Sequence, residues 1–302
     1  MSHLYSIIVS TKNNKNTIDL VLKSTLLLAE AYDTELLIID GKSTDKTTEI
    51  VKAFIEQYKS RYVETKLIQD PGVSLSYSRH IGYKHSRGDV LIYLDGDTLL
   101  TTTFRHYLPQ LLLRYDLIAP RYEIVPLDKA TKSFATFMKL IETLQSNSRK
   151  RDPSIFTPAR IFKREVLKRL KGYPPLSRFF GEDRIVTALA AKHGFRYGFA
   201  PVLRLVKFDE PGYYAYLKKH FRYGLGINKD LIKYGKYILR PYIIIRRLTY
   251  INNLLPIFTV IYIGVAIQTR QSFKNSLLDI VKMKHIVDLS MFIGDIIGFL
   301  KK

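Results

Sequence analysis

The run Val90-Leu91-Ile92-Tyr93-Leu94-Asp95-Gly96-Asp97 is the most informative part of this sequence of 302 residues. Five consecutive apolar residues predict a strand that is buried on both faces. Two carboxylates follow directly, and a spacing of two on an extended segment points their side chains the same way. Gly96 between them has no side chain, so we expect space there for a ligand to approach the backbone.

Similar units precede this run. Apolar, β-branched segments predict strands at residues 4–9, 35–39 and 63–68. Apolar residues at helical spacing predict helices that begin near residue 17 and near residues 43–45, and a third helix over residues 75–85. Because parallel strands need crossover helices, this alternation predicts an α/β fold, Rossmann-like, with a mostly parallel sheet and helices on both faces.

The second half of the chain is less regular. We predict a helix over residues 104–114, a short strand at 117–119 and a helix that opens at Asp183, and we interpret the basic cluster at 146–151 as a mobile loop. Beyond about Tyr234 isoleucine, leucine and tyrosine become more frequent. The sequence therefore predicts one domain over residues 1–234, with halves that meet near residue 100, and a helical apolar region over residues 235–302.

The composition narrows the classes of function. The chain has 48 Lys and Arg against 27 Asp and Glu, a net charge of +21, which favours an anionic partner such as nucleic acid, an acidic membrane surface or a phosphorylated small molecule. It has no cysteine, which excludes disulfides, thiolate zinc sites and cysteine nucleophiles and fits an intracellular location. The first residues do not have the pattern of a signal peptide.

Polar residues follow three of the predicted strands. In parallel sheets ligands bind beyond the carboxyl ends of the strands, so the segments after residues 9, 39 and 94 are expected to line one cleft. Asp95 and Asp97 suit a hard divalent cation, which takes one or two carboxylates together with phosphate oxygens and water. An Asp-Gly-Asp sequence is also ordinary turn chemistry, but a simple turn would not need two carboxylates on one side.

Several motifs, taken in order, resemble the inverting glycosyltransferases of family 2, which have the nucleotide-sugar-binding GT-A fold. The resemblance covers about residues 4–226, and its order and spacing are more specific than any single motif. The motifs are Ser6-Ile7-Ile8-Val9-Ser10-Thr11-Lys12-Asn13, Ile39-Asp40-Gly41-Lys42-Ser43-Thr44-Asp45-Lys46-Thr47, Ser78-Arg79-His80-Ile81-Gly82, Arg87-Gly88-Asp89, Leu94-Asp95-Gly96-Asp97, Gly181-Glu182-Asp183 and Lys219-His220-Phe221-Arg222-Tyr223-Gly224.

For the donor, the resemblance implies a nucleotide-binding half at about residues 1–100 and an acceptor-side half at about 101–234. Thr11, Asn13 and Asp40 would hold the nucleoside of a UDP- or GDP-sugar, with Arg79 near the nucleotide. Two alternatives remain open. Asp40 and Asp45 could cap the helix that follows them, and Arg79 could be a charge on a helix surface.

For the metal, the resemblance implies Mn²⁺ or Mg²⁺ under the diphosphate of the donor. Asp97 and Asp95 would hold the metal, with Asp95 also near the ribose. His220 is a further candidate, since imidazole is a plausible third ligand, although a surface histidine in a basic stretch is the simpler interpretation.

For the chemistry, the resemblance implies a base that takes the proton of the acceptor hydroxyl. Asp183 is the candidate base, with Glu182 as the alternate base or as an acceptor contact. A carboxylate at the start of a helix is also stabilised by the helix dipole, so Asp183 could serve structure instead. Arg222, with Lys219 beside it, would stabilise the charge that develops on the departing diphosphate.

The region after residue 234 suggests the acceptor. Residues 248–269 carry no formal charge, which is long enough to span a bilayer, but Asn252, Asn253 and Pro256 interrupt the first half. Arg247 and Arg270 flank the stretch, and basic flanks suit anionic lipid headgroups. We predict association with the cytoplasmic face of a membrane, and from it a sugar or polyprenyl-linked acceptor; the alternative is a helical cap packed on protein.

Two other classes of function remain as alternatives. A nucleotidyltransferase would share an α/β nucleotide site and a pair of metal-binding carboxylates, but the loop after the first strand, residues 10–16, has none of the glycines that such enzymes usually carry there. A nucleic-acid-binding protein would explain the charge and the 21 Tyr and 16 Phe, but no recognised nucleic-acid module occurs. We therefore expect no nucleic acid among the partners.

Overall fold

The computed structural model describes residues 3–125, 159–174 and 182–208. By its internal contacts the chain divides into two compact units, Met1–Glu123 with Phe156–Phe208 and Ile124–Ile155 with Asp209–Lys302. The described residues belong to the first unit, apart from Ile124 and Val125. The predicted loop at 146–151 and the predicted boundary near residue 234 lie outside the described residues.

The N-terminal half of the sheet is parallel, as the sequence predicts. The strands lie in the order β3-β2-β1-β4, and all three pairings between them are parallel. Every residue of β1 and β2 is buried, and β4 is buried up to its last residue, which explains the uninterrupted apolar runs. These strands are β1 (Tyr5–Thr11), β2 (Thr34–Asp40), β3 (Glu64–Gln69) and β4 (Val90–Asp95).

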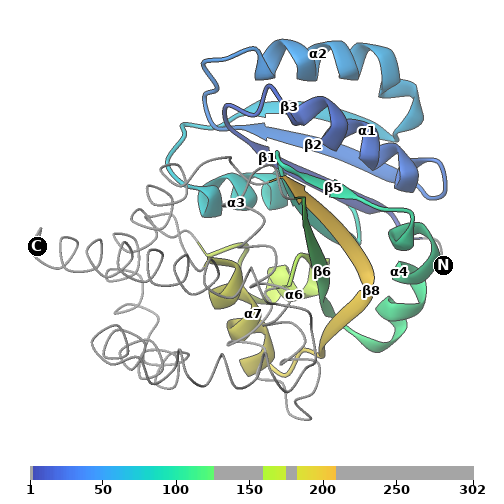
Figure 1. Cartoon of the computed structure of the whole chain (residues 1–302). Coiled ribbons are helices and arrows are strands. Elements are labelled where there is room, and N and C mark those ends of the chain that lie inside the picture. Colours follow the sequence, from blue (N-terminus) through green and yellow to red (C-terminus); the bar gives the residue numbers. More distant parts are fainter. Residues whose placement is uncertain (1–2, 126–158, 175–181, 209–302) are drawn as a thin grey trace, which may run out of the picture. The chain divides into compact units, whose positions relative to one another are not determined.

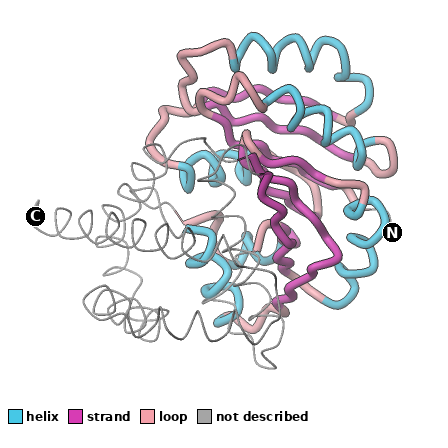
Figure 2. The backbone as a smooth tube through the Cα atoms, viewed as in Figure 1, coloured by secondary structure: helices cyan, strands magenta, loops and turns pink. Residues whose placement is uncertain are grey.

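The other half of the sheet is antiparallel. It continues the order beyond β4 as β7-β6-β8-β5, with antiparallel pairings of β4 with β7, β7 with β6, and β5 with β8. Figure 2 shows the eight strands as one curled sheet with the helices around it. The sequence predicts only the start of β6. These strands are β5 (Thr98–Leu100), β6 (Leu117–Val125), β7 (Ile161–Lys163) and β8 (Tyr197–Phe208).

Helices cover both faces of the sheet, which confirms the predicted fold class (Figure 1). One apolar core contains Ile7 and Val9 of β1 and packs against α1, α2 and α4; the other contains Ile8 and packs against α3, α6 and α7. Burial of each such side chain contributes about 1.5–3 kcal/mol. The helices are α1 (Ile18–Ala29), α2 (Thr47–Tyr58), η1 (Lys59–Arg61), α3 (Leu75–His85), α4 (Thr103–Arg114), α6 (Arg164–Arg169) and α7 (Glu182–Lys192).

Helix α3 packs closely on the sheet at a glycine, Gly82. It begins after Ser74, whose side-chain oxygen accepts a hydrogen bond from the backbone N–H of Tyr77 at 3.2 Å. A Cβ atom at Gly82 would overlap Cγ2 of Ile8 on β1, so glycine is required for this approach. Arg79 lies one turn before Gly82 on the same face. The close packing therefore places Arg79 at the end of the sheet where the parallel strands terminate.

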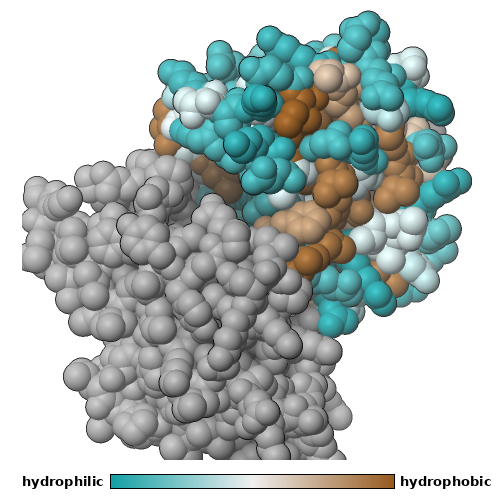
Figure 3. Space-filling model, turned by 45° about the horizontal axis from the view of Figure 1, so that its top comes forward, coloured by the Kyte–Doolittle hydropathy of each residue, from teal (hydrophilic) through white to brown (hydrophobic). Residues whose placement is uncertain are grey.

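Within the described residues, no helix is both long and apolar enough to cross a bilayer. On the face shown in Figure 3, the described residues are mainly hydrophilic, with apolar residues in patches between the polar ones. Residues 248–269 lie outside the described residues, so their association with a membrane stays a prediction.

Candidate active site

The polar strand ends lie side by side, as the sequence predicts. Thr11, Asp40 and Asp95 are the last residues of β1, β2 and β4. In the sheet register Thr11 is opposite Asp40, and Ser10 is opposite Asp95. The loops that follow these strands therefore share one edge of the sheet.

The loops after β1 and β2 are joined by hydrogen bonds through Asn13 and Ser43. The backbone N–H of Asn13 donates to Ser43 Oγ at 2.9 Å, and the backbone N–H of Thr44 donates to Asn13 Oδ1 at 2.8 Å. Asn13 and Lys42 both have left-handed backbone angles, with φ of 56° and 60°. The predicted nucleoside-binding residue Asn13 thus belongs to an ordered pair of loops.

Asp40 and Asp45 have different roles. Asp40 is 2% exposed and accepts hydrogen bonds from the backbone N–H of Ser43 at 3.1 Å and from its hydroxyl at 2.5 Å. Asp45 accepts from the backbone N–H of Thr47, the first residue of α2, at 3.0 Å. Asp45 therefore satisfies one backbone N–H at the start of α2, although the N-cap position itself is Lys46, and the helix-capping alternative is wrong for Asp40. A role of Asp40 in holding the nucleoside stays a prediction.

Gly96 serves packing, and the expectation that it leaves space for a ligand is wrong. A Cβ atom here would lie 2.6 Å from Asn14 Oδ1 and 2.7 Å from Thr11 Oγ1. The Gly96 carbonyl accepts a hydrogen bond from Thr17 Oγ1 at 2.7 Å, and its N–H donates to the Ser10 carbonyl at 2.9 Å. The turn between the two carboxylates is thereby fixed to β1 and the loop after it.

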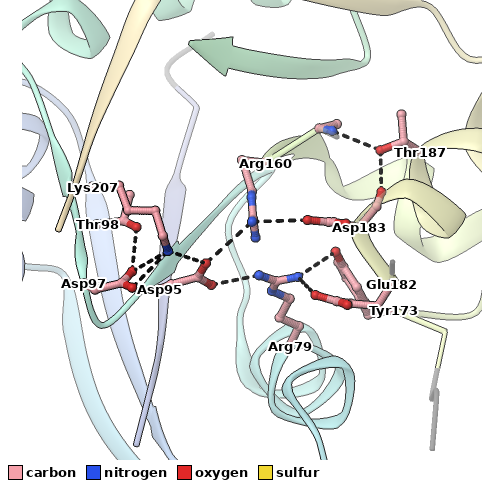
Figure 4. Close-up of polar contacts among 11 residues, drawn as sticks. Arg79, Asp95, Asp97, Thr98, Arg160, Tyr173, Glu182, Asp183, Thr187 and Lys207 are labelled. Atoms are coloured by element: carbon pink, nitrogen blue, oxygen red, sulfur yellow. Dashed lines mark hydrogen bonds and ion pairs between the residues drawn. The ribbon is translucent and has the colours of Figure 1, made fainter. Parts of the chain in front are cut away.

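Arg79 is buried and joins two carboxylates of the site, so the alternative of a surface charge is wrong. Its side chain is fully buried and donates from Nη2 to Asp95 Oδ1 at 2.7 Å and from Nη1 to Glu182 Oε1 at 2.6 Å (Figure 4). Nη1 also lies 3.3 Å from the Tyr173 hydroxyl. Burial alone would lower the pKa of Arg79, but Tyr173 and the carboxylates outweigh it and raise the pKa.

A second arginine, Arg160, joins the two sets of carboxylates. It precedes β7 and is 8% exposed, and its Nη2 lies 3.5 Å from Asp95 Oδ2 and 3.2 Å from Asp183 Oδ2. Its guanidinium carbon lies 5.8 Å from the ring centroid of Tyr122. Figure 4 shows Arg160 between the strand-end carboxylate and the acid pair of α7. One nitrogen thus holds Asp95 and Asp183 close together.

Asp95 stays ionised in this setting. Burial raises the pKa of its carboxyl, but Arg160, Arg79 and Lys207 outweigh burial and hold the pKa well below its ordinary value. A carboxylate held in this form at all physiological pH values can bind a cation without first losing a proton.

Glu182 and Asp183 open α7, as the sequence predicts, but they differ in environment. Burial, and then the charge of Asp183, raise the pKa of Glu182, whereas Arg79 opposes the rise. The Glu182 side chain is 7% exposed and the Asp183 side chain 15%. Thr187 donates to the Asp183 carbonyl at 2.6 Å and accepts from the backbone N–H of Ala159 at 2.9 Å, which ties α7 to the segment that carries Arg160.

Asp97 is paired with a lysine from the last described strand. Lys207 Nζ lies 2.8 Å and 2.9 Å from the two carboxylate oxygens of Asp97 and 3.9 Å from Asp95 Oδ2. Thr98 Oγ1 donates to Asp97 Oδ1 at 2.9 Å, and the backbone N–H of Phe208 donates to the Asp97 carbonyl at 2.9 Å. Strand β8 therefore fixes both the backbone and the carboxylate of Asp97.

Sequence reasoning missed three residues of the site: Arg160, Tyr173 and Lys207. The one signal for Arg160 is a lone charge directly before an apolar pair, and Lys207 is one cation among 48. Three predicted residues, Lys219, His220 and Arg222, lie outside the described residues, so their roles stay predictions.

The donor set fits a divalent metal that the substrate helps to hold. Asp95 and Asp97 offer hard carboxylate oxygens on one side of a turn, and Mg²⁺ or Mn²⁺ in such sites completes its shell with phosphate oxygens and water. Among the described residues, no group of three or more His, Asp or Glu could hold a metal alone. A site here would depend on the phosphates of a bound nucleotide.

Comparison with known proteins assigns the chain to a family. Residues 6–171, more than half of the chain, match the model of the family described as Glycosyl transferase family 2. The chain belongs to glycosyl transferase family 2. Membership of this family favours sugar transfer over the nucleotidyltransferase and nucleic-acid-binding alternatives.

One curated relative and several solved structures are similar to this family 2 chain. The cholesterol galactosyltransferase of Borreliella burgdorferi is 31% identical over 98 residues, which is 32% of this chain and only 26% of that protein. The chain thus matches about a quarter of the relative's length.

The solved structures share the GT-A fold. A mannosyltransferase from Pyrobaculum calidifontis, in complex with GDP-mannose and Mn²⁺, has a TM-score of 0.63 at 17% identity, over 98% of this chain and 88% of that one. Residues 1–349 of TarS from S. aureus, in complex with UDP-GlcNAc, give 0.56 at 15% identity, over 99% and 89%. At such identities the likeness shows the fold alone.

Proposed function

We propose that this glycosyltransferase moves a sugar from a UDP- or GDP-sugar to a hydroxyl or phosphate of an acceptor, with inversion at the anomeric carbon. The observation that carries the proposal is the double bridge in which Arg79 joins Asp95 to Glu182 and Arg160 joins Asp95 to Asp183. These bridges bring the strand-end carboxylate next to the acid pair of α7. Donor-holding and proton-accepting groups are then adjacent, as direct displacement requires.

For the donor, we propose that the loops after β1 and β2 bind the nucleoside through Thr11, Asn13 and Asp40. Asp97 and Asp95 would hold a divalent metal at the diphosphate. The chemistry that such a cation supplies is neutralisation of the charge that develops on the leaving oxygens. The similar structures contain GDP-mannose with Mn²⁺ and UDP-GlcNAc, which supports this class of donor. Arg222 and Lys219 remain the cations proposed from sequence, and His220 the further metal ligand.

For the base, we propose Asp183 rather than Glu182. Glu182 is 7% exposed and forms a 2.6 Å ion pair with fully buried Arg79, so its carboxylate serves to hold Arg79 in place. Asp183 is the more exposed of the two, at 15% against 7%, and lies in the first turn of α7. Its pairing with Arg160 orients the carboxylate beside Asp95.

The proposed reaction is a single displacement. The acceptor oxygen forms a bond to the anomeric carbon of the sugar from the face opposite the diphosphate. The bond between that carbon and the diphosphate oxygen breaks, and the electron pair leaves with the nucleoside diphosphate. Asp183 accepts the proton of the acceptor hydroxyl, so charge and atoms balance.

Two substitutions test these roles. We expect Asp97→Asn to weaken Mn²⁺-dependent binding of the donor and to abolish transfer, and Asp183→Asn to abolish transfer while donor binding persists. Asp19→Asn is the matched control, since Asp19 is a half-exposed carboxylate on α1 that pairs with Lys23. Binding is measured by calorimetry with a panel of nucleotide sugars. Full transfer by both variants would show that the assigned roles are wrong.

The products test the reaction class. Sugar transfer releases a nucleoside diphosphate, whereas nucleotidyl transfer releases pyrophosphate. The anomeric configuration of the product, read by NMR, tests inversion. Release of pyrophosphate, or retention of configuration, would contradict the proposed mechanism.

For the acceptor, we propose a sugar or polyprenyl-linked molecule at the cytoplasmic face of a membrane. The support is the uncharged stretch at residues 248–269 with its basic flanks, together with a relative whose name gives cholesterol as the acceptor. Flotation of the full chain with anionic and with zwitterionic vesicles tests the idea. Replacement of Arg246 and Arg247 by Gln should weaken binding to the anionic vesicles. If the wild type and this variant bind anionic and zwitterionic vesicles equally well, the proposed membrane association is refuted.

A further inference from the structure

An ammonium group lies where a divalent ion would have to bind. Lys207 Nζ is within 2.9 Å of both carboxylate oxygens of Asp97 and 3.9 Å from Asp95 Oδ2 (Figure 4). A metal that chelated both oxygens of Asp97 would need the lone pairs that the ammonium now uses, and two cations a few ångström apart repel each other. The ammonium and the metal therefore compete for the Asp97 carboxylate.

The position of this lysine is built into the sheet. Lys207 is opposite Thr98 in the antiparallel pairing of β8 with β5, and the next residue, Phe208, donates a backbone hydrogen bond to the Asp97 carbonyl. The Lys207 side chain is only 21% exposed. Its flexible four-carbon stem nevertheless allows the ammonium to move while the backbone stays fixed.

The two carboxylates depend on Lys207 to different degrees. Asp95 has Arg79 at 2.7 Å and Arg160 at 3.5 Å, so its charge is compensated without the lysine. For Asp97, by contrast, the ion pair found among the described residues is the one with Lys207. Departure of the ammonium would chiefly free Asp97.

We propose that Lys207 is a built-in competitor for the metal, which neutralises Asp97 in the metal-free enzyme and must withdraw before the cation binds. The inference rests on the proposed function in placing a metal at Asp97. It assigns to Lys207 the control of metal affinity: the enzyme binds Mn²⁺ or Mg²⁺ more weakly than two carboxylates on one turn would otherwise allow. Nucleotide binding then helps the exchange, since the diphosphate offers the displaced ammonium a new anionic partner.

Metal affinity of the full-length protein tests the proposal. Mn²⁺ binding is measured by electron paramagnetic resonance of the free ion, with and without UDP or GDP, for the wild type and for Lys207→Met. Removal of one like charge a few ångström from the metal should tighten binding roughly 10-fold or more. Lys207→Arg keeps the charge and should bind Mn²⁺ about as the wild type does. Lys23→Met, which removes a half-exposed lysine of α1, is the matched control and should change nothing.

Thermal unfolding gives a second readout. Without metal, Lys207→Met leaves Asp97 without its ammonium, so the variant should melt below the wild type. The same concentration of Mn²⁺ should then raise its melting temperature more than that of the wild type, because stabilisation by a ligand grows with the logarithm of its concentration divided by its Kd. Lys207→Gln, which can still donate to Asp97, provides the same comparison in a variant with the hydrogen bond retained.

The outcomes separate this inference from the proposed function. If the wild type binds Mn²⁺ and both neutral variants bind it no more tightly, Lys207 does not compete and the inference is overturned, while the metal site stands. If no protein binds Mn²⁺ with either nucleotide, the metal in the proposed function and the inference both fail. Tighter binding by the neutral variants, with unchanged binding by Lys207→Arg, supports both.

Discussion

Replacement of Arg79 by Met should destabilise the protein strongly. The side chain is fully buried and forms ion pairs of 2.7 Å with Asp95 and 2.6 Å with Glu182. Removal of one partner from a buried ion pair costs about 3–5 kcal/mol, because the remaining charge is left without compensation. Asp95 keeps Arg160, and Glu182 can take up a proton since its pKa is already raised, so we expect a loss of about 3 kcal/mol at pH 7.

The loss can be measured by urea denaturation. The chain has 21 tyrosines and no tryptophan, so tyrosine fluorescence reports unfolding, and circular dichroism gives an independent signal. Arg204→Met is the matched control, because Arg204 is 53% exposed and lies 3.6 Å from Glu123. An exposed pair of this kind contributes about 1 kcal/mol or less. If the two variants lose the same free energy of unfolding, the reasoning from burial is refuted.

The effect should also depend on pH. A carboxyl whose pKa is raised in the folded state binds more protons there than in the unfolded state, so its ionisation lowers stability as the pH rises. Without Arg79, the pKa of Glu182 should rise further. The pKa of Glu182 in the unfolded state is about 4.3. The loss of stability in Arg79→Met should therefore grow as the pH rises above about 4.3. A loss that does not change between pH 5 and pH 7 would contradict this assignment to Glu182.

Three further changes test other parts of the structure. Arg160→Met should lower kcat by roughly 100-fold through misplacement of Asp183, with a smaller change in donor binding by calorimetry; unchanged kcat would exclude this positioning role. Gly96→Ala should lose about 1–3 kcal/mol in urea denaturation because its Cβ overlaps the β1 loop, whereas Gly41→Ala, whose Cβ would meet ordinary contacts at 3.5 Å, should be nearly neutral. Hydrogen bonds from Arg196 and Lys163 hold the pKa of Asp116 far below its ordinary value. The contribution of Asp116 to the free energy of unfolding is therefore present above about pH 4 and is lost as the pH falls. Asp116→Asn should thus melt below the wild type at pH 7, with a difference that shrinks below pH 4; a constant difference would be inconsistent with the ion pairs.

The parallel half of the fold could be predicted because burial on both faces leaves continuous apolar runs. The antiparallel half could not be predicted, because its strands lack a clear sequence pattern. β5 and β7 have three residues each, too few for a pattern, and β8 contains Pro201 and Gly198, which weaken a strand pattern. Their place in the sheet is decided by pairing with distant strands, which local periodicity does not report.

The site divides in the same way. Asp95, Asp97 and Asp183 could be proposed as site residues from the sequence because each follows or opens an element whose pattern is strong. Arg160 and Lys207 could not, because a single cation in a basic chain becomes informative only when its partner is known. Even Arg79 was open to a surface interpretation, since nothing within α3 reveals that the helix lies against β1 at Gly82.

The ion pairs of the site also impose an order in time. Arg79 and Glu182 are 103 residues apart in the chain, and Asp97 and Lys207 are 110 apart. Closing such long loops costs more chain entropy than forming a local strand-helix unit, so we expect these pairs to form late in folding. During synthesis, Asp97 cannot pair with Lys207 until the end of β8 has left the ribosome. We therefore expect substitutions in these pairs mainly to speed unfolding and to leave the rate of folding almost unchanged.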